Sequence, residues 1–237
     1  MGELKVNNLE AWNETFRVSA AELEVKRGEI VSLMGPSGSG KSTFLNALAG
    51  FIPLRSGTIV ADGRDLTALP PEKRGLGYVF QKGALFAHLT IFQNLEFALR
   101  IQKIPAGERE AKVTAWLEKL EIAKLRDRLP KDVSGGEAQR AAFGRALITG
   151  FPYLLLDEPF SSLDVSLRAG MRELLKNLTH EAGVGALLVT HDPEDARALN
   201  ARGYQIDGGV IVKLLMIDHI LFKEIEPHSP KTDSAIK

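Results

Sequence analysis

The stretch from Gly35 to Thr43 limits what this 237-residue chain can fold into more than any other feature. It fits the pattern G-x-x-x-x-G-K-[ST] of loops that bind the phosphates of a nucleoside triphosphate. Glycines let backbone N–H groups approach phosphate oxygens closely, while Lys41 would add a positive charge and Ser42 a hydroxyl ligand for Mg²⁺. The candidate nucleotide-binding residues of the loop are Gly35, Pro36, Ser37, Gly38, Ser39, Gly40, Lys41, Ser42 and Thr43.

The residues on either side of this loop favour a nucleotide site over a flexible loop rich in glycine and serine. A mostly apolar run at 29–34 predicts a strand, and residues 42–49 predict a helix that ends at Gly50. A strand, a glycine loop and a helix in this order are what the motif requires. The N-terminus of the helix would also attract anionic phosphates.

Composition excludes several other kinds of site. Thirty basic and thirty acidic residues cancel, so the overall charge gives no reason to expect nucleic acid as a partner. The absence of cysteine rules out disulfides and thiolate metal sites, which suits the cytosol. No uninterrupted apolar run approaches the ~20 residues of a membrane span, and the N-terminus lacks an apolar signal core. If the protein works at a membrane, another chain must supply the membrane part.

The order of the predicted elements indicates an α/β fold with a mostly parallel central sheet. Short strands over residues 3–34 and a hairpin at 56–64 predict an antiparallel β subdomain near the N-terminus. Residues 90–126 have apolar side chains at helical spacing, which predicts an inserted α-helical subdomain. We expect a single domain over 1–237, with the α/β core and β subdomain at about 1–87 and 150–216, the helical subdomain at about 88–149 and a polar tail at about 227–237.

A second strong signal is the run 153–159, which ends in Asp157, Glu158 and Pro159. Its continuous apolar part predicts a central parallel strand covered on both faces, and ligands bind at the carboxyl ends of such strands. Removing two adjacent carboxylates from water at a buried strand end costs free energy, which favours a functional role for them. Asp157 is suited to anchor Mg²⁺, and Glu158 is suited to orient and polarise an attacking water molecule.

The residues that open a later helix form a second candidate anion site. Ser134 can cap this helix, and Gly135 and Gly136 leave its first backbone N–H groups uncovered. As an isolated pattern this signal is weak.

Three single side chains have two interpretations each. His191 follows a buried strand of the sheet that carries the phosphate-site motifs, which favours contact with a γ-phosphate over a structural role. Gln81 ends a short strand, where an isolated amide usually caps a loop. Trp12 fits a half-buried edge aromatic and a stacking face for an adenine ring about equally well.

Together these motifs resemble the ATP-binding subunits of ABC transporters over about residues 3–213. The resemblance rests on their order along the chain: 35–43, Gln81, 133–136 with Gln139, 154–159, 162–164 and His191. The serine-glycine-glycine signature separates this family from other phosphate-loop ATPases. The signature usually begins with leucine, and Val133 is a mild departure that should not alter the geometry of the glycines.

The resemblance implies an ATPase that works as a head-to-tail pair, with ATP and Mg²⁺ held between two subunits. One subunit would supply the phosphate loop and stack Trp12 on the adenine ring. The partner, a second copy of the chain or a relative, would supply Ser134, Gly135, Gly136 and Gln139, and Asp164 would contact across the dimer. The implied catalytic residues are Glu158, His191 and Lys41, and the implied metal site comprises Ser42, Gln81 and Asp157.

The resemblance also implies a membrane partner. Residues 81–90 with Asn94, and residues 69–74 upstream, resemble type I importer subunits that serve metal, polyamine, thiamine or oxyanion uptake. This implies an importer with transmembrane permease subunits and a solute-binding protein, and an ATPase peripheral on the cytoplasmic face of the membrane. Many ATPases of this group carry a further C-terminal regulatory domain, which we do not expect within 237 residues.

Two other functions use the same motifs. An ABC exporter or lipid-transport ATPase would have this site and a different membrane partner. A non-transport ABC protein acting on DNA or ribosomes usually has long coiled-coil insertions or two tandem cassettes, which do not fit in 237 residues with one phosphate loop. The transported solute is not encoded in this chain, because specificity lies in other chains.

Overall fold

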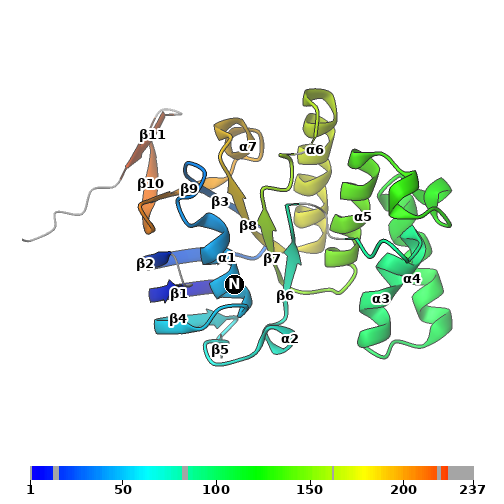
Figure 1. Cartoon of the computed structure of the whole chain (residues 1–237), viewed down its shortest axis with the longest axis horizontal. Coiled ribbons are helices and arrows are strands. Elements are labelled where there is room, and N and C mark those ends of the chain that lie inside the picture. The colour runs from blue at the N-terminus through cyan, green and yellow to red at the C-terminus, as the bar shows by residue number, and fades with distance from the viewer. Residues whose placement is uncertain (1, 13–15, 82–84, 162, 218–219, 224–237) are drawn as a thin grey trace, which may run out of the picture.

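The computed structural model describes residues 2–12, 16–81, 85–161, 163–217 and 220–223. Within these residues the strands form one sheet in the order β5-β4-β1-β2-β10-β9-β3-β8-β7-β6, with β11 paired to β10. Figure 1 shows antiparallel strands at one end of the molecule, the inserted helices at the other and the parallel strands between them. The predicted α/β class, with its mostly parallel central sheet, antiparallel β region and helical insertion, is confirmed.

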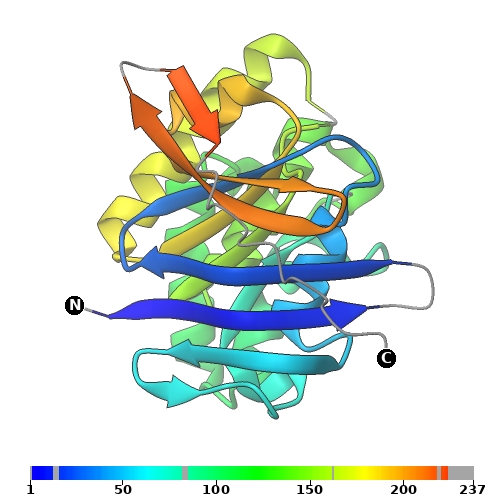
Figure 2. The same ribbon diagram turned by 90° about the vertical axis from the view of Figure 1, so that its left-hand side faces the viewer.

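The antiparallel strands alternate buried and exposed residues because one face of each packs on the core. The predicted turn at Asp62-Gly63 is confirmed, since both residues have a positive φ, as a two-residue hairpin turn of this type requires. The hydrophobic pattern of the sequence did not separate β11 from β10. Figure 2 shows the strands of this antiparallel region side by side. They are β1 (Glu3–Trp12), β2 (Arg17–Lys26), β4 (Leu54–Ala61), β5 (Arg64–Asp65), β10 (Val210–Ile217) and β11 (Ile220–Lys223), joined to the core by β9 (Arg202–Asp207).

The parallel core is covered on both faces, so every residue of two of its strands is buried. Leu155 and Leu187 pack in the hydrophobic cluster that includes α1 (Lys41–Ala49). Their neighbours Leu154 and Leu188 pack in the opposite cluster, with α5 (Gly135–Leu147) and α6 (Val165–Ala182). The core strands are β3 (Ile30–Met34), β6 (Leu76–Val79), β7 (Tyr153–Asp157) and β8 (Gly185–Thr190).

The inserted helices begin at local capping sequences. Thr90 caps α3 and exchanges hydrogen bonds with Gln93, as the capping-box pattern requires. The insertion contains α3 (Ile91–Ile101), α4 (Ala106–Lys119), the 3₁₀ turns η1 (Ala123–Leu125) and η2 (Pro130–Asp132), and α5. These elements fall within the span 88–149, and the division into subdomains stays a prediction. The predicted tail at 227–237 and Ser162 of the family motif lie outside the described residues.

Two short helices complete the fold, α2 (Pro71–Arg74) and α7 (Pro193–Ala198). Both begin with proline, whose missing N–H costs nothing in the first turn of a helix. Among the helices described here, none combines the length and the apolar composition that crossing a bilayer demands.

Candidate nucleotide-binding site

The loop before α1 closes around the ammonium group of Lys41. Its Nζ atom donates hydrogen bonds to the carbonyl oxygens of Gly35 at 2.8 Å and Pro36 at 2.9 Å, and the side chain is 5% exposed. The hydroxyl of Ser39 is buried without a hydrogen-bond partner among the described residues. A buried hydroxyl of this kind fits a loop that receives additional oxygen ligands, as the phosphates of ATP would provide. The loop therefore fits the triphosphate that its sequence pattern predicts.

Two glycines of the loop provide a test of its conformation. Gly38 has φ 79° and open space where a Cβ would lie, whereas at Gly40, with φ 101°, a Cβ would lie 2.5 Å from the Phe16 ring. We expect Gly38→Ala to cost about 1–2 kcal/mol through left-handed backbone strain alone. Gly40→Ala should cost about 1–3 kcal/mol more, because Phe16 must shift. Thermal melts should therefore rank wild type, Gly38→Ala and Gly40→Ala in falling Tm, and equal melting of the two variants would contradict this packing.

The candidate metal end of the site joins α1 to β7. The hydroxyl of Ser42 donates to Oδ1 of Asp157 at 3.0 Å, and the hydroxyl of Tyr78 lies 3.5 Å from Oδ2. Burial raises the pKa of Asp157, and the charge of Glu158 raises it further, while the hydrogen bond from Ser42 opposes both. A hydroxyl and a carboxylate are ligands that Mg²⁺ prefers, and Mg²⁺ needs few protein ligands because it keeps waters and phosphate oxygens. The pair therefore fits Mg²⁺, although no group of three or more acidic or histidine side chains is arranged around a metal position in the described part of the chain.

The raised pKa of Asp157 leads to a prediction for the subunit without nucleotide. Because the folded state holds this proton more tightly than the unfolded chain, the wild type loses stability as pH rises from about 3.8 through the folded pKa. Asp157→Asn has no such loss, so its Tm should exceed that of the wild type at neutral pH, and the two should converge below pH 4. Saturating ATP and Mg²⁺ should raise the Tm of the wild type much more than that of the variant. Melts across pH 3.5–8, with and without the ligands, check both statements, and a lower neutral-pH Tm for the ligand-free variant would contradict the first.

The backbone of Glu158 adopts a left-handed conformation that is uncommon for a residue with a side chain. Its φ is 44°, and such residues cost about 1–3 kcal/mol unless their surroundings hold them. Here the N–H of Glu158 donates to the carbonyl oxygen of Val189 at 3.0 Å. Its own carbonyl oxygen accepts from the hydroxyl of Ser161 at 2.9 Å and from the N–H of the same serine at 3.2 Å. These bonds fix the direction in which the Glu158 side chain leaves the strand.

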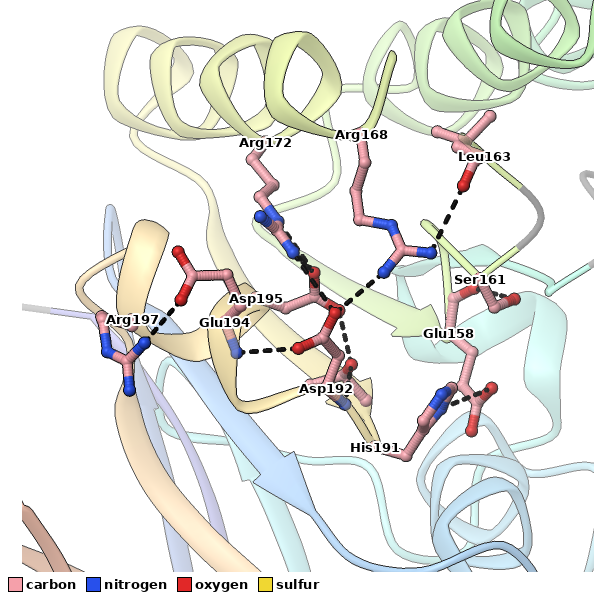
Figure 3. Close-up of polar contacts among 11 residues, drawn as sticks. Glu158, Ser161, Leu163, Arg168, Arg172, His191, Asp192, Glu194, Asp195 and Arg197 are labelled. Atoms are coloured by element: carbon pink, nitrogen blue, oxygen red, sulfur yellow. Dashed lines mark hydrogen bonds and ion pairs between the residues drawn. The ribbon is translucent and has the colours of Figure 1, made fainter. Parts of the chain in front are cut away.

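The carboxylate of Glu158 lies among three donors from different segments. Nζ of Lys41 lies 3.6 Å from Oε1, while Nδ1 of His191 and Nε2 of Gln81 each lie 3.3 Å from Oε2. Figure 3 shows His191 and Glu158 turned toward each other. These segments meet because the carboxyl ends of neighbouring parallel strands lie at one edge of the sheet. The structure thus brings together six predicted site residues: Lys41, Ser42, Gln81, Asp157, Glu158 and His191.

Trp12 lies at the end of β1 and is 40% exposed. The guanidinium carbon of Arg55 lies 4.3 Å from the centroid of its ring, and an open pocket of about 280 Å³ adjoins both side chains. Trp12 pairs with Arg17 across the hairpin, and the adjacent Phe16 contacts Gly40 of the phosphate loop. This position is compatible with stacking on an adenine ring, and that role stays a prediction.

The signature residues lie on the other face of the sheet from the phosphate loop. Ser134 caps α5, and both its hydroxyl and its N–H donate to Oε2 of Glu137 at 2.9 Å. These bonds lower the pKa of Glu137. Gly135 is exposed at the start of the helix and Gly136 is buried. Because α5 and α1 cover opposite faces, the chain does not bring Ser134 to its own Lys41.

Gln139 is buried within the single chain, and its predicted contact with nucleotide stays a prediction. Its side chain is 3% exposed, and its Nε2 atom is buried without a partner in the described residues. The reason is helical geometry, since Gln139 follows the buried Gly136 by three residues and shares its face of α5. Asp164, by contrast, is exposed and caps α6 by accepting from the N–H of Leu167 at 2.9 Å.

Sequence reasoning did not identify Tyr78 or Arg55. Tyr78 supports the site from β6, donating to Oδ1 of Asn46 at 3.2 Å and approaching Asp157. Burial, together with the negative charge of Asp157, raises the pKa of Tyr78, so its hydroxyl stays a donor. Tyr78 could have been identified from the sequence by its position, three residues before Gln81 on a strand that leads to the site.

Comparison with known proteins assigns the family. A family model described as ABC transporter matches residues 18–161, which include the phosphate loop, the signature, Asp157 and Glu158. An uncharacterised ABC transporter ATP-binding protein, y4fO of Sinorhizobium fredii, is 47% identical over 178 residues, which are 75% of this chain and 52% of that protein. The spermidine/putrescine import ATP-binding proteins PotA of Aliivibrio fischeri and Thermotoga maritima are 42% and 37% identical, over 82% and 90% of this chain and 52% and 58% of those proteins. The chain spans about half the length of the curated relatives that it matches. The match covers more than half of the chain and includes Lys41, Gln81, Asp157 and Glu158, so the chain belongs to the ABC transporter family.

Proposed function

We propose that this chain is the ATP-hydrolysing subunit of an ABC importer and binds ATP with Mg²⁺. The observation that carries the proposal is the position of the Glu158 carboxylate, within 3.6 Å of donors on Lys41, Gln81 and His191 and next to the Ser42–Asp157 pair. Phosphoryl transfer needs positioning and charge stabilisation more than covalent chemistry, and this cluster offers both.

The position of each side chain in this cluster suggests its role in hydrolysis. Lys41 exchanges the carbonyl oxygens of Gly35 and Pro36 for phosphate oxygens, which bind an ammonium group more strongly. Ser42 and Asp157 would hold Mg²⁺, which would neutralise phosphate charge when bound. The carboxylate of Glu158 accepts a hydrogen bond from the attacking water and directs it at the γ-phosphate.

The neighbours of Glu158 complete this arrangement. His191 would donate a hydrogen bond to the γ-phosphate. Gln81, which follows β6, donates to the same carboxylate and lies 3.5 Å from the hydroxyl of Ser161, so a displacement of its segment would alter the water-orienting group directly.

Two copies of the chain complete each other's sites in this proposal. Ser134 and Gly135 are exposed at the N-terminus of α5, where free backbone N–H groups and the helix dipole attract an anion. They lie on the sheet face opposite Lys41, so the phosphate they would bind belongs to a second subunit. Asp164, exposed at the start of α6, would contact the same partner.

The membrane partner and the solute are inferred from the relatives. Several of them are named as ATP-binding proteins for spermidine/putrescine import, so a polyamine is the first solute to test. The chain would act with permease subunits and a solute-binding protein, as a peripheral subunit on the cytoplasmic face of the membrane.

The deciding experiment measures phosphate release by the purified chain, alone and coexpressed with any permease encoded next to its gene. We expect hydrolysis that requires Mg²⁺, is lost on chelation and increases in the complex. Copurification with nucleic acid instead of a permease would support the non-transport alternative. Absence of Mg²⁺-dependent hydrolysis in both preparations would contradict the proposal.

A further inference from the structure

The residues after Glu158 and those after His191 are connected by one arginine of α6. Nη1 of Arg168 donates to Oδ2 of Asp192 at 2.8 Å, and Nη2 donates to the carbonyl oxygen of Leu163 at 3.3 Å. Asp192 directly follows His191, and Leu163 directly precedes Asp164. Figure 3 shows the guanidinium group between these two segments. A single side chain therefore joins two segments that both carry predicted site residues.

These contacts close a ring that returns to the catalytic carboxylate. From Glu158 the chain folds back through the bond from the N–H of Ser161 to the Glu158 carbonyl oxygen, at 3.2 Å. The N–H of Leu163 then donates to the carbonyl oxygen of Phe160 at 3.1 Å, which fixes the turn that Arg168 holds. On the other side, His191 meets Oε2 of Glu158 at 3.3 Å. A change at any point of such a ring alters the distance between the His191 ring and the Glu158 carboxylate.

The segment around His191 is also anchored independently of Arg168. Arg172, one turn further along α6, donates from Nε to Oδ1 of Asp195 at 2.8 Å, and the hydroxyl of Thr190 donates to Oδ2 of the same carboxylate. Asp195 is 4% exposed, so this pair holds α7 against α6 and β8. Its contacts lie behind His191 and do not reach the Leu163–Asp164 turn. Nη2 of Arg172 also lies 3.5 Å from Oδ2 of Asp192, so both arginines approach this carboxylate, and of the two only Arg168 links it to the carbonyl oxygen of Leu163.

The pairing of Arg168 is incomplete in a way that favours a positioning role. Its Nε atom is buried without a partner among the described residues, which is costly, whereas Arg172 directs its Nε at a carboxylate. An arginine that served stability alone would be expected to satisfy this N–H. The geometry instead uses the fork of the guanidinium group to hold two acceptors, the Asp192 carboxylate and the Leu163 carbonyl, at a fixed separation.

We propose that Arg168 is a positioning residue that couples the Leu163–Asp164 turn to His191, so that docking of a second subunit on this turn sets the distance between His191 and Glu158. This inference rests on the proposed ATPase function and adds a route within one subunit by which pairing adjusts the hydrolytic groups. A ligand contact is not part of the proposal, because Arg168 acts through Asp192.

The activity test compares Arg168→Ala, Arg168→Lys and a control, Arg197→Ala. Arg197 forms an exposed pair with Glu194 on α7 at 2.6 Å, and within the described part of the chain its side chain is joined neither to Asp192 nor to the turn. We expect Arg168→Ala to bind ATP within about twofold of wild type but to lower kcat by about tenfold or more, because small displacements of reacting groups have effects of this order. The Hill coefficient for ATP should also fall toward one. Arg168→Lys should recover part of kcat, since lysine can keep one acceptor but not both, and Arg197→Ala should match the wild type.

A double-variant cycle separates coupling from two independent effects. Asp192→Asn removes the charge that Arg168 binds at 2.8 Å and that Arg172 approaches at 3.5 Å, and it keeps an oxygen that can cap α7. If the two side chains act as one unit, Arg168→Ala/Asp192→Asn should lower kcat no more than the worse single variant. The proposal would be overturned if the effects of the two single variants on kcat multiplied in the double variant. It would also be overturned if Arg168→Ala kept the wild-type kcat and Hill coefficient, or lost no more kcat than Arg197→Ala.

Hydrogen exchange in the absence of nucleotide tests the coupling without relying on turnover. In Arg168→Ala, the backbone amides of residues 191–195 other than Pro193 and those at 163–164 should exchange faster together, while Arg197→Ala leaves both segments unchanged. If Arg168→Ala does not fold, Arg168→Lys and Asp192→Asn provide the same comparison. Unchanged exchange at 191–195 would refute the coupling even if the chain hydrolyses ATP. Absence of ATP hydrolysis by the wild type would count against the proposed function alone, since the exchange result still decides the coupling.

Discussion

Replacing Glu158 by glutamine is expected to leave ATP binding intact, to slow hydrolysis by about 100-fold or more and to accumulate an ATP-bound dimer. Glutamine has the size of glutamate, so the amide oxygen can keep a contact with His191 or Gln81, which both approach Oε2 at 3.3 Å. It cannot accept a proton from water, and it removes a negative charge near the γ-phosphate. The substitution thus stops turnover while favouring the closed, nucleotide-bound pair.

Steady-state phosphate release and size-exclusion chromatography with ATP and Mg²⁺ measure the two parts of this result. The matched control is Glu194→Gln, the same chemical change in an exposed ion pair with Arg197 on α7, which should hydrolyse ATP at the wild-type rate. Wild-type hydrolysis by Glu158→Gln would exclude Glu158 from the reaction. Loss of hydrolysis without any ATP-dependent dimer would contradict the shared site.

Replacing Lys41 by alanine should weaken nucleotide binding itself, by about 10- to 100-fold, because a hydrogen bond to a charged group contributes about 1.5–3 kcal/mol. The ammonium group is almost fully buried and bonds to the carbonyl oxygens of Gly35 and Pro36, so no other charge can take its place in the loop. Its removal also leaves these two carbonyls without their donor, which should loosen the loop.

Isothermal titration with ATP and Mg²⁺ gives the affinity, and a thermal melt establishes that the variant is folded. Lys73→Ala is the control, since Lys73 is exposed on α2, away from the loop. Unchanged affinity in a folded Lys41→Ala protein would contradict the assignment of residues 35–43 to phosphate binding.

Much of the local structure could be predicted because its causes are local. Ser134 opens a helix because its hydroxyl accepts from the N–H of Glu137, while the Glu137 carboxylate accepts from the N–H of Ser134, within one turn of chain. The turn at Asp62-Gly63 follows from two adjacent residues that tolerate positive φ. The run of buried residues in β7 could be read as a central strand, because only a strand covered on both faces has no polar side.

Sequence reasoning did not place Gln139 in the core, although its position three residues after Gly136 on α5 indicates this. Its Nε2 atom has no partner among the described residues, and its contact with nucleotide stays a prediction. Arg55 and Tyr78 were missed for a different reason. Each acquires its relevance from a neighbouring strand, β1 for Arg55 and β7 for Tyr78, and no motif marks that adjacency.

The sequence by itself determined the chemistry of the phosphate loop, the strand that ends in Asp157 and Glu158, and the family to which the chain belongs. Only the tertiary structure decided which side chains meet. Gln81 and His191 reach Glu158 from 77 and 33 residues away because β6, β7 and β8 are neighbours in the sheet. The same is true of Arg168, whose partners Leu163 and Asp192 lie on two segments that no local pattern connects. Strand order arises from packing both faces of the whole sheet at once, so no single stretch of the sequence specifies it.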